Sequence, residues 1–363
     1  MQKTIAIKPI NIDPMMVTWD LGRRCNYDCS YCEARHHNNY SKHRSLEECK
    51  SVYQFIKDWT GTYNEHRNNK FSTTINFTGG EPTNNPDFWN IIKYIREDDK
   101  DVKLSLTTNG TWHKKHTDFI VENMNGVTIS YHCEADDKIK SMVLDNICRL
   151  KETNIWLQVN LMLHVDYFEE CKQVYDELKQ LNVNVKLRPI GDGNVAIMGW
   201  FKDTDGNMRR TTHEYTEEQQ EWFYKQHGKD YKTEKEAKGT DLGRQCCGSR
   251  QLCGKVDNSW QPITLVDTHF KDWYCMVDWY FLHIDHETEL VYHHQTCQAY
   301  HGKRKGSIGS LQEKDKLLSD LKNRLTNDDT PIICPNDRCG CGMCVPKSKD
   351  LTEYKEIFNA IRG

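Results

Sequence analysis

The chain has no apolar run long enough to cross a membrane. Its mean hydropathy is −0.82, and no uninterrupted apolar stretch approaches the roughly 18 residues that a spanning helix needs. Residues 1–14 also contain no apolar signal-peptide core, so nothing in them directs export. These absences predict a protein that works in the cytoplasm, away from the bilayer.

An excess of either charge is also missing. The 363 residues include 49 Lys and Arg against 53 Asp and Glu, which gives a formal net charge of −4. This balance predicts no general attraction to nucleic acid or to an anionic membrane surface. No internal repeat or low-complexity tract interrupts the chain, whose length suits one large domain or two modest ones.

Cysteine, by contrast, is abundant. Sixteen cysteines could belong to a secreted disulfide scaffold, but a chain of this length does not need such cross-links. Nine of them lie between Cys246 and Cys344. This concentration favours metal binding in a reducing compartment.

The most informative cysteines form the C-x3-C-x2-C run of Cys25, Cys29 and Cys32. Three thiolates within eight residues can face one point when the backbone curls around a cluster, and an iron–sulfur cubane takes Cys ligands. Three protein ligands leave one iron open for a substrate or cofactor. A zinc knuckle is the alternative, although zinc sites usually pair two C-x2-C halves or mix Cys with His.

From residue 16 to about residue 200, short apolar runs alternate with longer helical patterns. Six β/α units at this spacing predict parallel strands joined by right-handed crossovers, two short of the usual eight-stranded barrel. A Ser cap followed three residues later by Glu, at Ser45 and Glu48, predicts a capping box at the start of the first helix. The expected strands are 16–21, 73–77, 102–107, 127–131, 156–163 and 183–189, and the expected helices are 45–60, 87–98, 117–123, 137–153 and 168–181.

A second motif, Gly79-Gly80-Glu81-Pro82, closes the second expected strand. Together with the cysteine run some fifty residues earlier, it resembles the radical S-adenosylmethionine (radical SAM) superfamily. The resemblance implies an α/β fold built on an open, partial (β/α)6 TIM-like barrel. It also implies that Cys25, Cys29 and Cys32 hold a [4Fe-4S] cluster whose open iron binds S-adenosylmethionine.

The resemblance further implies which residues meet this cofactor. Gly79 and Gly80 would let the backbone approach the methionyl ammonium, and Glu81 would accept its hydrogen bond. Further candidates stand in the cysteine run or on later strands, and each could instead serve its own backbone: Tyr31, Thr107, Asn109, Ser130, Asn160 and Arg188. His132 and Glu134 follow Ser130 towards the expected substrate space, where we hypothesise that they transfer protons.

The C-terminal third predicts a Cys-flanked β-hairpin of strands 279–285 and 289–294, followed by a polar helix near 311–325. A run of four cysteines in eleven residues then indicates a metal site, with structural zinc as the alternative. This tail resembles the SPASM and twitch auxiliary-cluster domains, although its x4/x1/x2 spacing differs from the usual SPASM pattern. The expected ligands of at least one auxiliary iron–sulfur cluster come from Cys275, Cys297, Cys334, Cys339, Cys341 and Cys344, with Cys246, Cys247 and Cys253 surplus to one cluster.

These patterns divide the chain into four parts: an N-terminal extension (1–15), the partial barrel (16–200), a linker with a helix near 216–226 (201–244) and the auxiliary-cluster domain (245–363). The leading functional hypothesis is modification of a peptide or protein side chain, although the 1–15 extension is too short for a leader-peptide-binding domain. The alternatives are a radical SAM enzyme of a small molecule, sugar or nucleotide, and a non-catalytic iron–sulfur or zinc protein. A reductant such as flavodoxin or ferredoxin is the expected partner.

Overall fold

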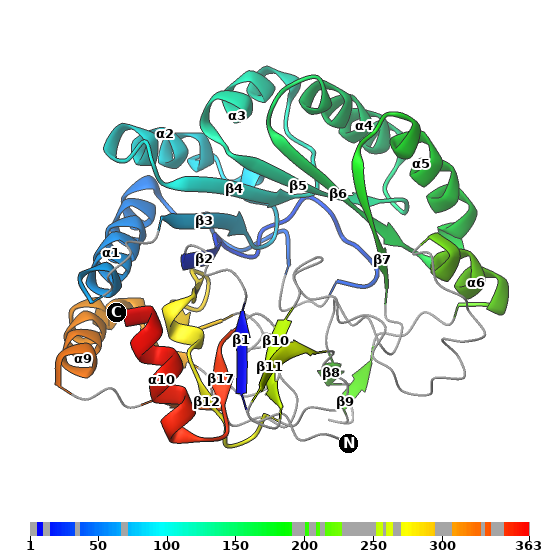
Figure 1. The fold of residues 1–363 in the computed structure, drawn as a ribbon. Helices are drawn as coiled ribbons and strands as arrows, with labels where there is room; N and C mark the ends of the chain where they lie inside the picture. The colour runs from blue at the N-terminus through cyan, green and yellow to red at the C-terminus, as the bar shows by residue number, and fades with distance from the viewer. Residues whose placement is uncertain are drawn as a thin grey trace.

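A nine-stranded sheet organises the molecule in the computed structural model (Figure 1). Its strands run in the order β15-β14-β13-β2-β3-β4-β5-β6-β7. The structure describes residues 6–9, 15–32, 37–66, 72–190, 200–202, 208–210, 215–226, 252–256, 259–263, 270–294, 307–327, 331–334 and 345–362.

Six consecutive strands of this sheet are parallel, which confirms the predicted partial α/β barrel. Each pairs with the next along the chain in an unbroken register. The strands are β2 (Met15–Asp20), β3 (Thr73–Thr78), β4 (Lys103–Thr108), β5 (Gly126–His132), β6 (Trp156–Leu163) and β7 (Asn184–Pro189).

Helices cover the outer face of these strands (Figure 1). The predicted capping box begins the first of them, since the Ser45 side chain accepts from the Glu48 backbone and the Glu48 carboxylate accepts from the Ser45 backbone. The helices are α1 (Leu46–Glu65), α2 (Phe88–Asp98), α3 (Thr117–Asn123), α4 (Asp137–Lys151) and α5 (Phe168–Gln180). No helix in the described ranges is both long and apolar enough to span a bilayer.

The two faces of the barrel strands differ in burial. On β2, for example, Val17 and Trp19 are fully buried under the helices, whereas Thr18 and Asp20 on the opposite face are partly exposed. Side chains alternate between the faces of a strand, so the same pattern recurs on β3, β4 and β5. The inner face is therefore a polar, partly accessible surface, and all six strands end at the same edge of it.

The predicted C-terminal hairpin is confirmed as β13 (Phe281–Asp285) and β14 (Leu290–Tyr292). It extends the barrel sheet, because β13 pairs in parallel with β2, and β14 pairs in antiparallel with β15 (Ser307–Ser310). Helix α9 (Lys314–Asn327) then packs beside α1. There Arg324 and Tyr63 both bond the buried Asp278 carboxylate, at 2.6 and 2.9 Å.

A second, antiparallel sheet gathers segments from both ends of the chain. The N-terminal strand β1 (Ala6–Pro9) pairs with β10 (Leu252–Val256) and β17 (Lys347–Ser348). The other strands and α-helices of the described ranges are β11 (Ser259–Ile263), β12 (Tyr274–Cys275) and β16 (Ile332–Ile333) of this sheet, the hairpin of β8 (Trp200–Lys202) and β9 (Met208–Arg210), α6 (Glu217–Gln226) and α10 (Leu351–Arg362).

Candidate active site

The three cysteines of the C-x3-C-x2-C run lie on residues 21–32, the cluster loop, which follows the carboxyl end of β2. All three cysteines are partly exposed, and none of them is in a disulfide. The loop is held at its start because Cys25 donates its N–H to the Asn38 carbonyl at 2.7 Å, and Asn38 donates to the Arg23 carbonyl at 2.8 Å. The cysteines are thus presented on a braced loop.

Gly79 and Gly80 pack directly against the start of this loop. Gly80 donates its N–H to the Gly22 carbonyl at 2.7 Å. A Cβ on Gly80 would lie 2.4 Å from the carbonyl oxygens of both Arg23 and Arg24, and a Cβ on Gly79, which has a φ of +123°, would lie 2.5 Å from the Gly22 oxygen. Only glycine permits this backbone contact, so both glycines serve to position the cluster loop.

The Glu81 carboxylate is buried and accepts four hydrogen bonds. Its Oε1 accepts from the Thr83 N–H at 2.9 Å, from the Thr83 hydroxyl at 2.6 Å and from the Thr108 hydroxyl at 2.8 Å. Its Oε2 accepts from the Asn109 N–H at 2.7 Å. Burial raises the pKa of Glu81, and these donors oppose the rise. Since a carboxylate oxygen can accept about two hydrogen bonds, Oε2 is the atom with capacity left.

Asn109 and Thr107 contact protein groups near the cluster loop. The Asn109 amide donates to Asn26 Oδ1 at 2.8 Å and lies 4.0 Å from Cys25 Sγ. The Thr107 hydroxyl donates to Asn76 Oδ1 at 3.3 Å, on the inner face of the barrel. Both side chains therefore contact other protein groups in this structure, and their contacts with S-adenosylmethionine stay predictions.

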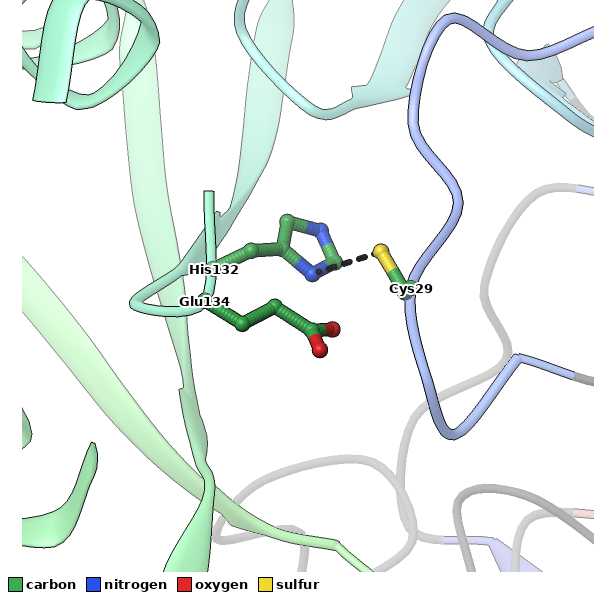
Figure 2. A group of neighbouring side chains, drawn as sticks. All are labelled: Cys29, His132 and Glu134. Atoms are coloured by element: carbon green, nitrogen blue, oxygen red, sulfur yellow. Dashed lines mark hydrogen bonds between the residues drawn. The ribbon is translucent and has the colours of Figure 1, made fainter. Parts of the chain in front are cut away.

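Cys29, His132 and Glu134 converge where β5 ends (Figure 2). His132 Nδ1 lies 3.4 Å from Cys29 Sγ and also contacts the Tyr31 hydroxyl. The Tyr31 and His132 rings stack with centroids 5.9 Å apart. Removal from water lowers the pKa of His132 to about 4, so its imidazole is neutral at pH 7. Tyr31, one of the predicted cofactor contacts, packs on His132 in this structure.

Glu134 also forms hydrogen bonds with the cluster loop. Its two carboxylate oxygens accept from the Ser30 N–H at 3.2 and 3.3 Å. The Ser30 hydroxyl in turn lies 3.1 Å from Nε2 of the buried His164. The two residues hypothesised to transfer protons, His132 and Glu134, thus both touch the cluster loop.

The inner face opposite the loop carries the other predicted residues. Ser130, Asn160 and Lys186 are neighbours across β5, β6 and β7. Asn160 Oδ1 accepts from Arg188 Nε at 3.3 Å. Burial, followed by the nearby Arg188 charge, lowers the pKa of Lys186. Two basic side chains thus stand on the inner face of β7.

The structure describes two of the predicted auxiliary-cluster cysteines, Cys275 and Cys334, and both are buried. Cys275 lies opposite Ile332 across the β12–β16 pair, and Cys334 donates its N–H to the Trp273 carbonyl at 2.8 Å. The two cysteines are therefore diagonal neighbours on one face, with Cα atoms about 7–8 Å apart. Of the other predicted ligands, Cys297, Cys339, Cys341 and Cys344 lie outside the described residues, as do Cys246, Cys247 and the side chain of Cys253.

Sequence reasoning missed several residues of this site. Asn26, Thr108 and His164 all contact the predicted residues or the cluster loop. His164 had a readable signal, because it directly follows β6 as His132 ends β5, and neighbouring parallel strands end at one edge. The contact of Gly22 with Gly79 and Gly80 had no such signal, because nothing in the local sequence indicates it.

The residues present fit an iron–sulfur cluster. Burial raises the pKa of Cys25 to about 11 and that of Cys29 further, so both thiols need a cation to stabilise their thiolate form. The Tyr27 N–H already points at Cys25 Sγ at 3.4 Å. The three thiols therefore lie on one braced loop at the carboxyl edge of a partial barrel. α/β barrels hold their active sites at this edge, so the arrangement suits a protein that ligates a cluster in its active site.

The chain belongs to the radical SAM superfamily, whose family model matches residues 19–206. It is therefore a radical SAM enzyme with a [4Fe-4S] cluster and S-adenosylmethionine as cofactors. Among curated proteins it is 23% identical over 185 residues to GTP 3′,8-cyclase of Clostridium perfringens, covering 47% of this chain and 54% of that protein. It is 30% identical over 97 residues to mycofactocin maturase MftC of Mycobacterium tuberculosis, covering 27% of this chain and 22% of that protein.

The chain thus spans about half the length of the first of these relatives, and less of the second. Among solved structures, anSMEcpe with bound AdoMet and Cp18Cys peptide matches with a TM-score of 0.51 and 16% identity, over 95% of this chain and 96% of that one. This likeness shows a shared fold over the matched 95% of the chain.

Proposed function

We propose that this radical SAM enzyme modifies a peptide or protein side chain by abstracting a hydrogen atom from it. The observation that carries the proposal is the fold, which matches a peptide-bound radical SAM structure over nearly the whole chain. MftC, a maturase by name, adds support over the 97 residues of its match.

The cluster, when bound with S-adenosylmethionine and reduced, supplies the 5′-deoxyadenosyl radical that abstracts hydrogen. Cys25, Cys29 and Cys32 would hold three irons, and a flavodoxin or ferredoxin would deliver the electron. The chain's own contribution is position, because the reacting carbon must be held close and water excluded. The Gly79–Gly80 contact with Gly22 keeps the cluster loop in place for this purpose.

Glu81 is our candidate for the methionyl ammonium, and the spare capacity of Oε2 supports the role. Three donors fix Oε1, whereas among the described residues Oε2 accepts only from the Asn109 N–H. An ammonium near Oε2 would complete the carboxylate's hydrogen bonds. Ser130, Asn160 and Arg188 line the inner face further along and would meet the rest of the cofactor or the substrate.

The test begins with anaerobically reconstituted protein, S-adenosylmethionine and dithionite. We expect 5′-deoxyadenosine to form, and the Cys25/Cys29/Cys32→Ala variant to form none. A short peptide encoded beside the gene should stimulate the reaction and change in mass. Cleavage retained by the triple variant would refute the assignment of the first cluster.

A second candidate substrate is an anionic small molecule, such as a nucleotide. Lys186 and Arg188 on the inner face of β7 favour it, since two neighbouring cations suit a phosphate or carboxylate. GTP 3′,8-cyclase is also among the relatives. Deuterated nucleotides distinguish the two candidates, because transfer of their deuterium into 5′-deoxyadenosine would support the small-molecule reading and argue against the peptide.

We also assign at least one auxiliary iron–sulfur cluster to the C-terminal region. The placement of Cys275 and Cys334 on one face of paired strands supports them as two of its ligands. Cys297, Cys339, Cys341 and Cys344 remain predicted ligands. Iron counting tests this: about eight irons per chain, half of them retained in the Cys25/Cys29/Cys32→Ala variant, is the expected result. Zinc in the tail, with about four irons elsewhere, would make it a structural module.

A further inference from the structure

Two buried thiols meet directly behind the candidate active site. Cys133 follows His132 at the end of β5, and Cys171 lies in α5. Their sulfur atoms are 3.2 Å apart, and the two residues are 1% and 0% exposed. Neither thiol touches the cluster loop, so the pair lies outside the machinery proposed above. Cys171 Sγ also lies 3.5 Å from the Met162 carbonyl.

The pair is set apart from the other single cysteines of the barrel. Cys49 is buried in α1 and Cys148 is exposed on α4. Isolated cysteines in a barrel are usually packing residues. A packing role explains the burial of Cys133 and Cys171, but it does not need two sulfurs in contact.

The geometry points to a redox-active dithiol, in which Cys133 and Cys171 are converted to a disulfide by a small two-electron oxidant such as hydrogen peroxide. A disulfide requires an S–S distance of about 2.05 Å, so the sulfurs must approach by little more than 1 Å. In the first step one thiol is oxidised by peroxide to a sulfenic acid, with release of one water. The second thiol then displaces the hydroxyl group as another water and forms the S–S bond.

The placement of the pair gives such a bond a route to the active site. Cys133 is bonded directly to His132, whose imidazole contacts Cys29. His132 faces the cluster loop, where its imidazole contacts Cys29, whereas Cys133 begins the turn after β5 and faces Cys171 of α5. Drawing Cys133 towards Cys171 would therefore move the His132 backbone away from the loop.

Peptide mapping of reconstituted wild-type protein tests the proposal. The protein is treated with a few equivalents of hydrogen peroxide, quenched in acid with N-ethylmaleimide and digested with trypsin without reductant. Trypsin leaves Cys133 in peptide 116–138, Cys171 in peptide 152–172 and Cys148 in peptide 141–149, one cysteine in each. We expect peptides 116–138 and 152–172 to be joined, two hydrogens lighter than their sum, and to separate on reduction.

Matched variants complete the test. Cys148→Ser should leave the joined peptides unchanged, whereas Cys133→Ser and Cys171→Ser should each abolish them. The wild-type measurement decides by itself if either variant fails to fold. Maleimide on both Cys133 and Cys171 after treatment that oxidises Cys148 would overturn the proposal, as would a bond from Cys133 to the cluster-loop peptide 25–35.

Discussion

Replacing Glu81 by Gln tests separately two roles of its carboxylate, the hydrogen bonds that it accepts from neighbouring protein groups and the bond that we propose to the methionyl ammonium. The substitution keeps an oxygen that can remain at Oε1, where the Thr83 and Thr108 donors converge. It places an NH2 group at Oε2, where the Asn109 N–H donates at 2.7 Å. Two donors then face each other, and the atom that we assign to the methionyl ammonium no longer accepts.

The expected losses of cofactor affinity and of stability follow from typical hydrogen-bond energies. Loss of one hydrogen bond to a charged group costs about 1.5–3 kcal/mol, so the affinity for S-adenosylmethionine should fall about 10- to 150-fold. The buried Asn109 N–H loses its acceptor, which should lower the free energy of unfolding by about 1–3 kcal/mol. In protein that remains folded, the loss of stability alone would not lower the affinity for S-adenosylmethionine by this factor.

Calorimetric titration of anaerobically reconstituted protein measures the affinity, and urea denaturation measures the stability. Thr108→Val is the matched control, because it removes one donor to Oε1 and leaves Oε2 untouched. It also removes the acceptor of the Gly110 N–H at 3.0 Å, so it should cost about 1–3 kcal/mol of stability with unchanged cofactor affinity. Unchanged affinity in Glu81→Gln at equal iron content would refute the role of Oε2.

Three further predictions concern other parts of the site. Gly80→Ala should displace the cluster loop and reduce the iron bound on reconstitution, while Gly61→Ala in α1, whose Cβ would meet no atom within 4 Å, should leave iron binding intact and stabilise the helix by about 0.5–1 kcal/mol. His132→Phe removes the contact between the imidazole and Cys29 Sγ, and it should shift the midpoint potential of the first cluster, as measured by redox titration with EPR detection. Burial, and then the Asp285 charge, raises the pKa of Asp20 to about 8, so the folded state binds a proton that the unfolded state releases. Stability should therefore fall as the pH rises from about 4 to 8, and Asp20→Asn should flatten this slope in urea denaturation.

Each of these predictions can fail clearly. Full iron content in Gly80→Ala would show that the loop tolerates displacement. A midpoint potential unchanged in His132→Phe would limit His132 to packing against Tyr31. An equal pH slope in wild type and Asp20→Asn would mean that another group carries the proton.

Much of the barrel could be predicted from local sequence. The alternation of apolar runs with amphipathic stretches located six parallel strands and five helices, each within a few residues of its observed bounds. The capping box at Ser45 and Glu48 was also readable. These features depend on residues a few positions apart, and their energetics are local.

The candidate site was readable in part for the same reason. The C-x3-C-x2-C run and the Gly-Gly-Glu-Pro motif each bring chemistry within a few residues. The sequence alone could not show that Gly79 and Gly80 press on Gly22, or that His132 reaches Cys29. These contacts depend on the register between strands, which a short motif does not specify.

The sequence by itself determined the α/β alternation and the family, and it located the cysteines that we propose as iron ligands. Only the tertiary structure decided that β13 lies in parallel beside β2, and that β1 joins the C-terminal sheet. The residues of these pairs stand more than 200 positions apart, so no local pattern encodes the pairing. It is selected by which strand edges remain unpaired, and by which apolar faces remain to be buried, once the six parallel strands have formed.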